Sequence, residues 1–450
     1  MNALLTAAPL LLRRRGALAD ILPIIAFAAA TAILATVLGG TAAFIGRLPE
    51  GGQIPRTGEG SIIGLLVLCA VVACVLLVPS AMGLGGSAAR LSLARREKDL
   101  ATTRLIGGTS AQVGGIAVLD VAAQALLGSI VGIVLHILVS PPLSRLDFGI
   151  APFTTADLLM PWWAYPLLVL GVVVLASGSA AISLTGVVLS PLGVARDSRV
   201  VRMSVIRVLV WGAAVLGFLV FSQVGGALFG DVADGGFVIV VTVVFVGAIV
   251  AGLNVVGPFV VWITARLLAR LAPSPALLVG ARRLAADPRA GWRAVSGITF
   301  ALVIAGFLTV LSLLSEPTTP EEAMMTTALA TGGVLTLGIA AVLAAVSTGV
   351  TQTARVIDQA PVLRSQHIAG AQVPQLHRAR IAEISVPVVL STVLAILTSA
   401  MVVAALGFNT ANPAAAVQYL ASVVGAYALV IGAVLVASPL VRRYALRPVG

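Results

Sequence analysis

Ten long apolar segments alternate with eleven polar stretches along this chain of 450 residues, and the basic residues fall on every second stretch. Of the 28 lysines and arginines, only Arg47, Arg56 and Arg145 lie on the even-numbered stretches. Short loops rich in Lys and Arg stay on the cytoplasmic side of a membrane, so the pattern predicts an orientation. We therefore expect a multi-pass membrane protein with both termini in the cytoplasm.

Each apolar segment is long enough to be a transmembrane helix, because about 20 apolar residues cross the hydrocarbon core in helical form. Strands are excluded, since open sheet edges cannot face lipid. The predicted spans are 18–45, 61–85, 113–140, 161–187, 205–228, 237–266, 293–314, 324–351, 381–407 and 417–438. The fold class is thus an all-α polytopic membrane protein with about ten spans.

Composition supports a membrane location and narrows the partners. The chain is 59% apolar and 10% charged, whereas a soluble domain carries about 25% charged residues. The net charge of +11 lies at the inner ends of the spans, where it meets anionic lipid headgroups, so membrane lipid is expected as a partner and nucleic acid is not. The excess of arginine over lysine, with abundant Ala, Gly and Val, indicates a GC-rich bacterial genome and hence a bacterial cytoplasmic membrane.

Two cytoplasmic loops and the helices that follow them align at an offset of 263 residues. Gly107 then corresponds to Gly370, Gln112 to Gln375, and the acidic Asp120 to Glu383. Each half also closes on Ser-Pro-Leu and arginine, at 190–196 and at 438–443. An internal repeat of this kind predicts two four-span units joined by a two-span connector. We place the units at 1–196 and 277–450, with the connector at 197–276, and expect both units to have the same orientation.

The first loop contains Lys98-Asp99, the run Arg104-Leu105-Ile106-Gly107-Gly108-Thr109, the pair Gln112-Val113, and Asp120. In this order the motifs resemble the FtsX-like permease domain of FtsX/MacB-type ABC transporters. The resemblance covers roughly 61–196 and 324–447. The second copy departs from the pattern, with Pro361-Val362 in place of the basic-acidic pair and His367 in place of the arginine.

The resemblance implies that each repeat docks one copy of a cytoplasmic ABC ATPase, two copies in all. The residues expected to form the docking sites are Arg95, Asp99, Leu100, Arg104 and Gly107 in the first loop and Leu363, Arg364, His367 and Gly370 in the second. Charges lie all around the helix predicted over 91–106, which suits a polar protein surface better than lipid. The alternative is a solvated connecting helix.

The chain itself is not expected to be an enzyme. A phosphate-binding loop of the Walker type requires a lysine, and Lys98 is the only lysine. ATP and magnesium therefore belong to the separate ATPase, and no cofactor is expected in this chain. No combination of His, Cys and acidic residues has the spacing of a metal site.

Two features of the predicted spans leave alternatives open. Asp120 and Glu383 lie near the inner ends of their spans, where an acid indicates function by default, although a structural pair with a nearby arginine is favoured. Gly128 and Gly132 form a Gly-xxx-Gly pair that suits close helix packing. The alternative is that glycine is simply common in membrane helices.

The sequence thus predicts the permease subunit of an ABC transporter. The outer loops at 46–60 and 315–323 are too short for the large extracytoplasmic domain that the resembling family commonly carries. An efflux system that exports or extracts a hydrophobic substrate (a lipid, lipopeptide, peptide antibiotic or drug) fits this, and an extracytoplasmic partner protein is a further candidate. The alternatives are a non-transporting regulator of a cell-envelope enzyme and an ion-driven secondary transporter.

Overall fold

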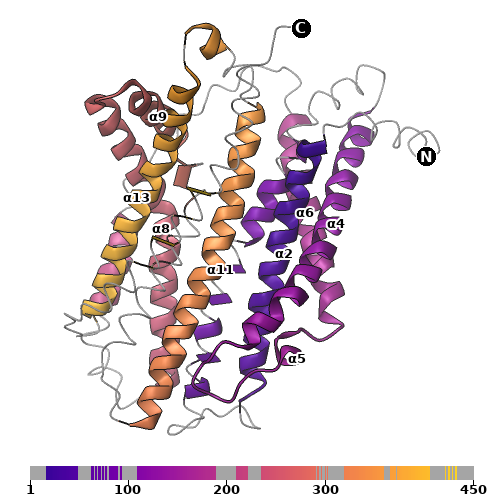
Figure 1. Cartoon of the computed structure of the whole chain (residues 1–450), viewed down its shortest axis with the longest axis vertical. Helices are drawn as coiled ribbons and strands as arrows, with labels where there is room; N and C mark the ends of the chain where they lie inside the picture. The colour runs from indigo at the N-terminus through magenta and orange to yellow at the C-terminus, as the bar shows by residue number, and fades with distance from the viewer. Residues whose placement is uncertain are drawn as a thin grey trace. The chain divides into compact units, whose positions relative to one another are not determined.

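The computed structural model of the chain describes residues 17–48, 109–188, 209–220, 235–289, 319–358 and 365–405 without 371, together with parts of 62–93, 291–302 and 421–432. These residues are almost entirely helical (Figure 1), and none of them lies in a strand. The all-α fold class is confirmed. The loop residues Arg95, Asp99, Leu100, Arg104, Gly107, Leu363 and Arg364 lie outside the described residues.

The main helices follow the hydropathy pattern. They are α2 (Ala17–Ile45), α4 (Ser110–Ser144), α6 (Ala164–Val188), α8 (Gly235–Leu271), α11 (Pro320–Asp358) and α13 (Val373–Ala405), with the short α5 (Thr155–Leu158) and α9 (Pro275–Ala286) between them. In the described part of the chain, five helices are long and apolar enough to cross a membrane. The chain is therefore a multi-pass membrane protein, and the count of ten spans stays a prediction.

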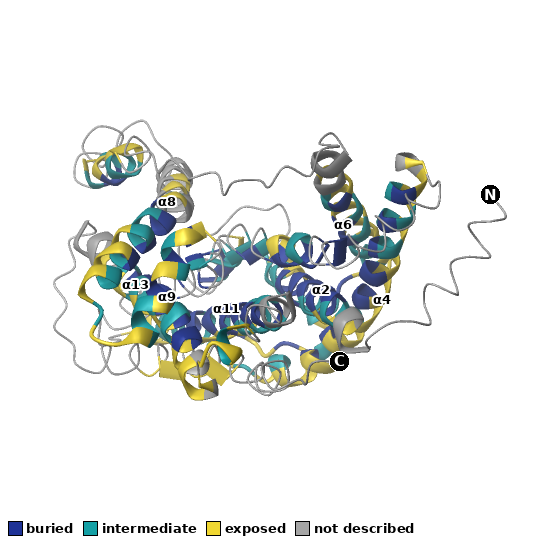
Figure 2. Cartoon of the chain, turned by 90° about the horizontal axis from the view of Figure 1, so that it is seen from above, coloured by how far each residue is buried: buried dark blue, intermediate teal, exposed yellow. Residues whose placement is uncertain are grey.

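Several helices are longer than the membrane is thick. The 35 residues of α4 measure about 52 Å at 1.5 Å per residue, against about 30 Å of hydrocarbon. Large apolar side chains such as Leu119, Leu127 and Leu138 stay 54–71% exposed on the protein, and exposed residues form one side of α4 and of α13 (Figure 2). Such surfaces suit contact with lipid tails.

The chain divides into two compact units, each discontinuous in sequence. Unit 1 comprises 1–39, 78–141 and 159–198, and unit 2 comprises 40–77, 142–158 and 199–450. In unit 1, α2 packs closely on α4 through Gly128 and Gly132. A Cβ at position 128 would lie 2.5 Å from Phe27 Cβ, and one at 132 would lie 2.5 Å from the Ala28 carbonyl oxygen. The close-packing interpretation of this glycine pair is confirmed.

In unit 2, the short helix α9 packs on both α8 and α13. It begins where Ser274 caps it, with the Ser274 hydroxyl accepting a hydrogen bond from the Leu277 N–H and Pro275 in the first turn, a combination typical of helix N-termini. Leu284 and Ala281 are buried on one side of α9, while Arg282 is exposed on the other. The amphipathic pattern of α9 explains this position.

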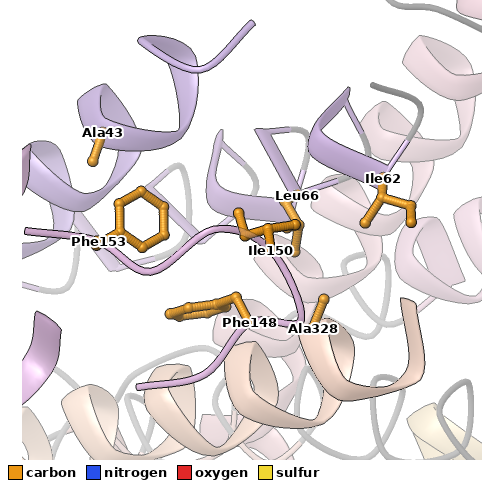
Figure 3. Close-up of a cluster of buried hydrophobic side chains, with 7 residues drawn as sticks. All are labelled: Ala43, Ile62, Leu66, Phe148, Ile150, Phe153 and Ala328. Atoms are coloured by element: carbon orange, nitrogen blue, oxygen red, sulfur yellow. The ribbon is translucent and has the colours of Figure 1, made fainter. Parts of the chain in front are cut away.

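A second feature of unit 2 is an apolar cluster at the end of α2 that the charge pattern places outside the cell. Its buried residues, drawn in Figure 3, are Ala43, Ile62, Leu66, Phe148, Ile150, Phe153 and Ala328. Phe44 adds edge-to-face contacts with Phe148 and Phe153, at ring separations of 5.2 and 5.1 Å. Loop 145–158 is thus held by aromatic packing.

Arg47 fixes the same loop by polar contacts. Its guanidinium donates to the carbonyl oxygens of Ala151 and Pro152, lies 3.9 Å from the Asp157 carboxylate, and stacks 3.7 Å from the ring centre of Phe153. These contacts give a local reason for one of the three exceptions to the charge alternation. The Arg47 side chain holds a loop and carries no information on topology.

Candidate functional site

The described part of the predicted docking sites is the turn that joins α11 to α13 in unit 2. Ser365–Ile368 form one helical turn, which ends where the Gly370 N–H donates to the His367 carbonyl oxygen at 3.0 Å. Gly370 has a φ of +98°, a conformation that L side chains rarely adopt. Of the predicted site residues here, Gly370 therefore reverses the chain, and His367 lies half-buried beside it.

The helices α4 and α13, which follow the two aligned loops, begin in the same way. The side-chain oxygen of Gln112 accepts from the Thr109 N–H at 3.1 Å, and that of Gln375 accepts from the Gln372 N–H at 3.1 Å. Each glutamine reaches back three residues, as in a capping box. Both caps obey the offset of 263, and so do the first residues of α4 and α13. The two glutamines of the motif are helix caps.

The turn is tied to α9 by a hydrogen bond. The Arg283 guanidinium donates to the Gln366 side-chain oxygen at 3.1 Å, with both groups partly buried. Beside this bond α9 crosses α13 at Gly280, where an added Cβ would lie 2.8 Å from the Ala379 carbonyl oxygen and 3.1 Å from the Glu383 nitrogen. Because these neighbours are backbone atoms, only glycine allows this approach. The turn is therefore in direct contact with α9, and α9 is in direct contact with α13.

A second hydrogen bond ties α13 to α11. The Arg380 guanidinium, 7% exposed, donates at 3.3 Å to the side chain of Gln352, which is 5% exposed. At the offset of 263 the first repeat has Ala117 and Ala89 in these places, and both are fully buried. The second repeat thus has a buried polar bridge where the first has small apolar residues.

Around the turn, the surface is polar with one apolar exception. Ser365, Gln375 and Arg378 are exposed, and Ile368 is 72% exposed. Ile368 lies on the helical turn at 365–368, which precedes the membrane span predicted over 381–407.

The intramembrane acids have different local surroundings. The Asp120 carboxylate accepts a hydrogen bond from the Gln124 side-chain nitrogen at 2.7 Å, one helical turn further along α4. Glu383 is half-buried where α9 crosses α13. Both acids therefore lie on a packed helix, eleven residues into α4 and α13 from their N-terminal ends. No group of three His, Cys or acidic residues among the described residues is placed to hold a metal.

Sequence reasoning missed the polar residues that connect the turn to its neighbours: Arg283, Gln352, Gln366 and Arg380. Each is a single arginine or glutamine whose partner is 28 or 83 residues away. The repeat itself offers one signal, because Gln352 and Arg380 stand where the first repeat has two alanines.

Comparison with known proteins finds a similar family for one block of the chain. No curated protein matches the chain at a significant level. A family model described as FtsX-like permease C-terminal matches residues 71–188. The match includes the whole first cytoplasmic loop, the Gln112 cap and Asp120, so the resemblance predicted from the loop motifs is confirmed for this block. Residues 71–188 of this membrane protein are therefore similar to the FtsX-like permease C-terminal family.

Proposed function

We propose that this chain is the membrane subunit of an ABC transporter that exports or extracts a hydrophobic substrate, driven by a separate cytoplasmic ATPase. The observation that carries the proposal is the recurrence of one junction. A cytoplasmic loop followed by a glutamine-capped membrane helix occurs in the matched domain and again 263 residues later. Two equivalent junctions suit two ATPase copies, since ABC ATPases act as a pair.

The docking surface of the second repeat consists of the exposed turn and its rim. Ile368 supplies an apolar contact, and Ser365, Gln375 and Arg378 supply hydrogen-bonding groups around it. In the first repeat we assign docking to Arg95, Asp99, Leu100, Arg104 and Gly107. ATP and magnesium bind to the ATPase, the chain lies in a bacterial cytoplasmic membrane, and both termini lie in the cytoplasm.

The first test is site-specific crosslinking in cells. Ile368 is replaced by benzoyl-phenylalanine, and the captured protein is identified by mass. An ABC ATPase is expected at position 368, whereas the same probe at the exposed Ala156 of the outer loop is expected to capture none. Capture of the ATPase at 156, or of lipid alone at 368, contradicts the proposed docking and orientation.

A second test separates the two docking sites. Asp99→Arg combined with Arg104→Glu reverses the charges of the first loop, and reversed interface charges lose both pairing and steering. We expect the ATPase to co-purify poorly with this variant, while membrane insertion is unchanged. Because the second loop lacks the basic-acidic pair, removal of its charges is expected to weaken binding less.

Transport is distinguished from regulation by reconstitution. With the ATPase in vesicles, an exporter removes a fluorescent lipid or lipopeptide from the membrane only when ATP is hydrolysed. A regulator of a cell-envelope enzyme hydrolyses ATP without changing the distribution of the probe. ATP-independent movement that follows an ion gradient would instead support a secondary transporter.

A further inference from the structure

One histidine is buried inside unit 1, in the contact between α2 and α4. His136 is 1% exposed, and its Nδ1 atom lies 3.1 Å from the Thr36 hydroxyl oxygen. That hydroxyl has one hydrogen, which it donates to the Ala32 carbonyl oxygen at 2.8 Å. The Thr36 oxygen must then accept from His136, so the proton of the neutral ring is on Nδ1.

This assignment leaves a lone pair on Nε2 of His136. The atom is buried and has no hydrogen-bond partner among the described residues. Buried polar atoms in proteins are nearly always satisfied, by protein or by another molecule, because leaving one unpaired is costly. The Nε2 atom is therefore an acceptor that requires a donor.

The start of α6 lies beside the His136 ring. The ring of Tyr165 is centred 6.1 Å from that of His136, and the Tyr165 hydroxyl accepts a hydrogen bond from the Met160 N–H at 3.3 Å. Tyr165 is only half-buried, and the neighbouring Trp162 is 83% exposed, as aromatic residues at a membrane–water interface commonly are.

We propose that Nε2 of His136 is a binding site for one hydroxyl group, which enters beside Tyr165 and donates a hydrogen bond to the ring. The hydroxyl belongs either to a water molecule or to the head group of an amphipathic molecule in the membrane. The site is separate from the proposed ATPase docking sites, because none of its residues belongs to the two loops that are proposed to dock the ATPase.

The test uses ¹⁵N-histidine NMR of the full chain in nanodiscs. The chain has three histidines, so His367→Asn and His377→Asn leave His136 as the only signal. We expect a protonated Nδ1 and a Nε2 resonance shifted in the direction of a hydrogen-bonded acceptor. The Thr36→Val variant removes the partner of Nδ1 and should reduce the preference for this tautomer.

Two lipid compositions separate the sources of the hydroxyl. Phosphatidylcholine has no hydroxyl in its head group, so a hydrogen-bonded Nε2 in phosphatidylcholine alone identifies water. A hydrogen-bonded Nε2 that appears only with phosphatidylglycerol identifies the lipid head group. Three results overturn the proposal: a proton on Nε2, a free Nε2 in both membranes, or loss of the bonded signal in Tyr165→Phe, which would make the tyrosine itself the donor.

Discussion

The contact between α2 and α4 predicts opposite outcomes for the same substitution at different glycines of one helix. In Gly128→Ala the new Cβ would lie 2.5 Å from Phe27 Cβ and 2.8 Å from the Ile24 carbonyl oxygen. The second neighbour is backbone, so the helices must move apart. Overpacking of this kind costs about 1–3 kcal/mol. In Gly115→Ala the new Cβ meets no described atom within 4 Å.

The separation has a second cost, because it strains the hydrogen bond from Thr31 to Ser129, which measures 3.2 Å. Hydrogen bonds between membrane helices contribute about 0.6 kcal/mol on average. Replacing glycine by alanine in a helix also gains about 0.5–1 kcal/mol in chain entropy, but this gain is common to both variants. The difference in unfolding free energy between Gly128→Ala and Gly115→Ala is therefore about 1.5–3.5 kcal/mol.

Reversible unfolding in SDS mixed micelles measures this difference. Gly132→Ala should resemble Gly128→Ala, since its Cβ would lie 2.5 Å from the Ala28 carbonyl oxygen. The double variant should lose less than the sum, because helices already moved apart by one methyl group accommodate the next. Equal stability of Gly128→Ala and Gly115→Ala would refute the close contact and leave the glycines as ordinary membrane-helix residues.

Three further outcomes follow from unit 2. A double-mutant cycle of Gln352→Ala and Arg380→Ala should give a coupling energy of about 1 kcal/mol in SDS unfolding; a coupling of zero would mean that their hydrogen bond adds no stability. Gly370→Ala should destabilise the turn by about 1–2 kcal/mol because of its positive φ, whereas Gly332→Ala in α11 should not. The pKa of Asp157 is lowered mainly by a hydrogen bond from the Thr154 N–H, and also by Arg47. Its contribution to loop stability is therefore present above the unfolded pKa, near 3.9, and is lost as pH falls through the lower folded pKa. The Thr154 amide NMR shift should titrate below that value, and Arg47→Gln should raise the midpoint.

The sequence predicted the membrane helices well because their cause is local. A run of about 20 apolar residues is sufficient to place a helix in a membrane, and the described α2, α4 and α11 each contain the span predicted for them. The beginning of α13 was less accurate. Hydropathy places it at 381, but the helix begins at Val373, because its first two turns contain Gln375, Arg378 and Arg380. A hydrogen-bonded cap starts the helix before the apolar run does.

The roles of individual polar residues could not be predicted, because they depend on contacts between distant segments. Arg47 was an unexplained exception to the charge alternation. Its role requires the carbonyl oxygens of a loop about 100 residues away. The sequence around Gly280 likewise does not indicate that a glycine is required there. The requirement comes from the backbone of α13, which crosses α9 at this residue.

The two predicted repeats differ in the contacts of the helices that lie next to the proposed docking loops. In the second repeat the turn is joined to α9 by Arg283 and Gln366, and α13 is joined to α11 by Arg380 and Gln352. The first predicted repeat has Ala89 and Ala117 in place of the latter pair, and neither buried side chain can form such a hydrogen bond. Movement of an ATPase against the second turn would therefore shift α11 and α13 together. The close helix contact described in the first predicted repeat is instead the one between α2 and α4, at Gly128 and Gly132. If an ATPase acts on each loop as proposed, equal movements of the two ATPases would shift the membrane helices of the two predicted repeats unequally.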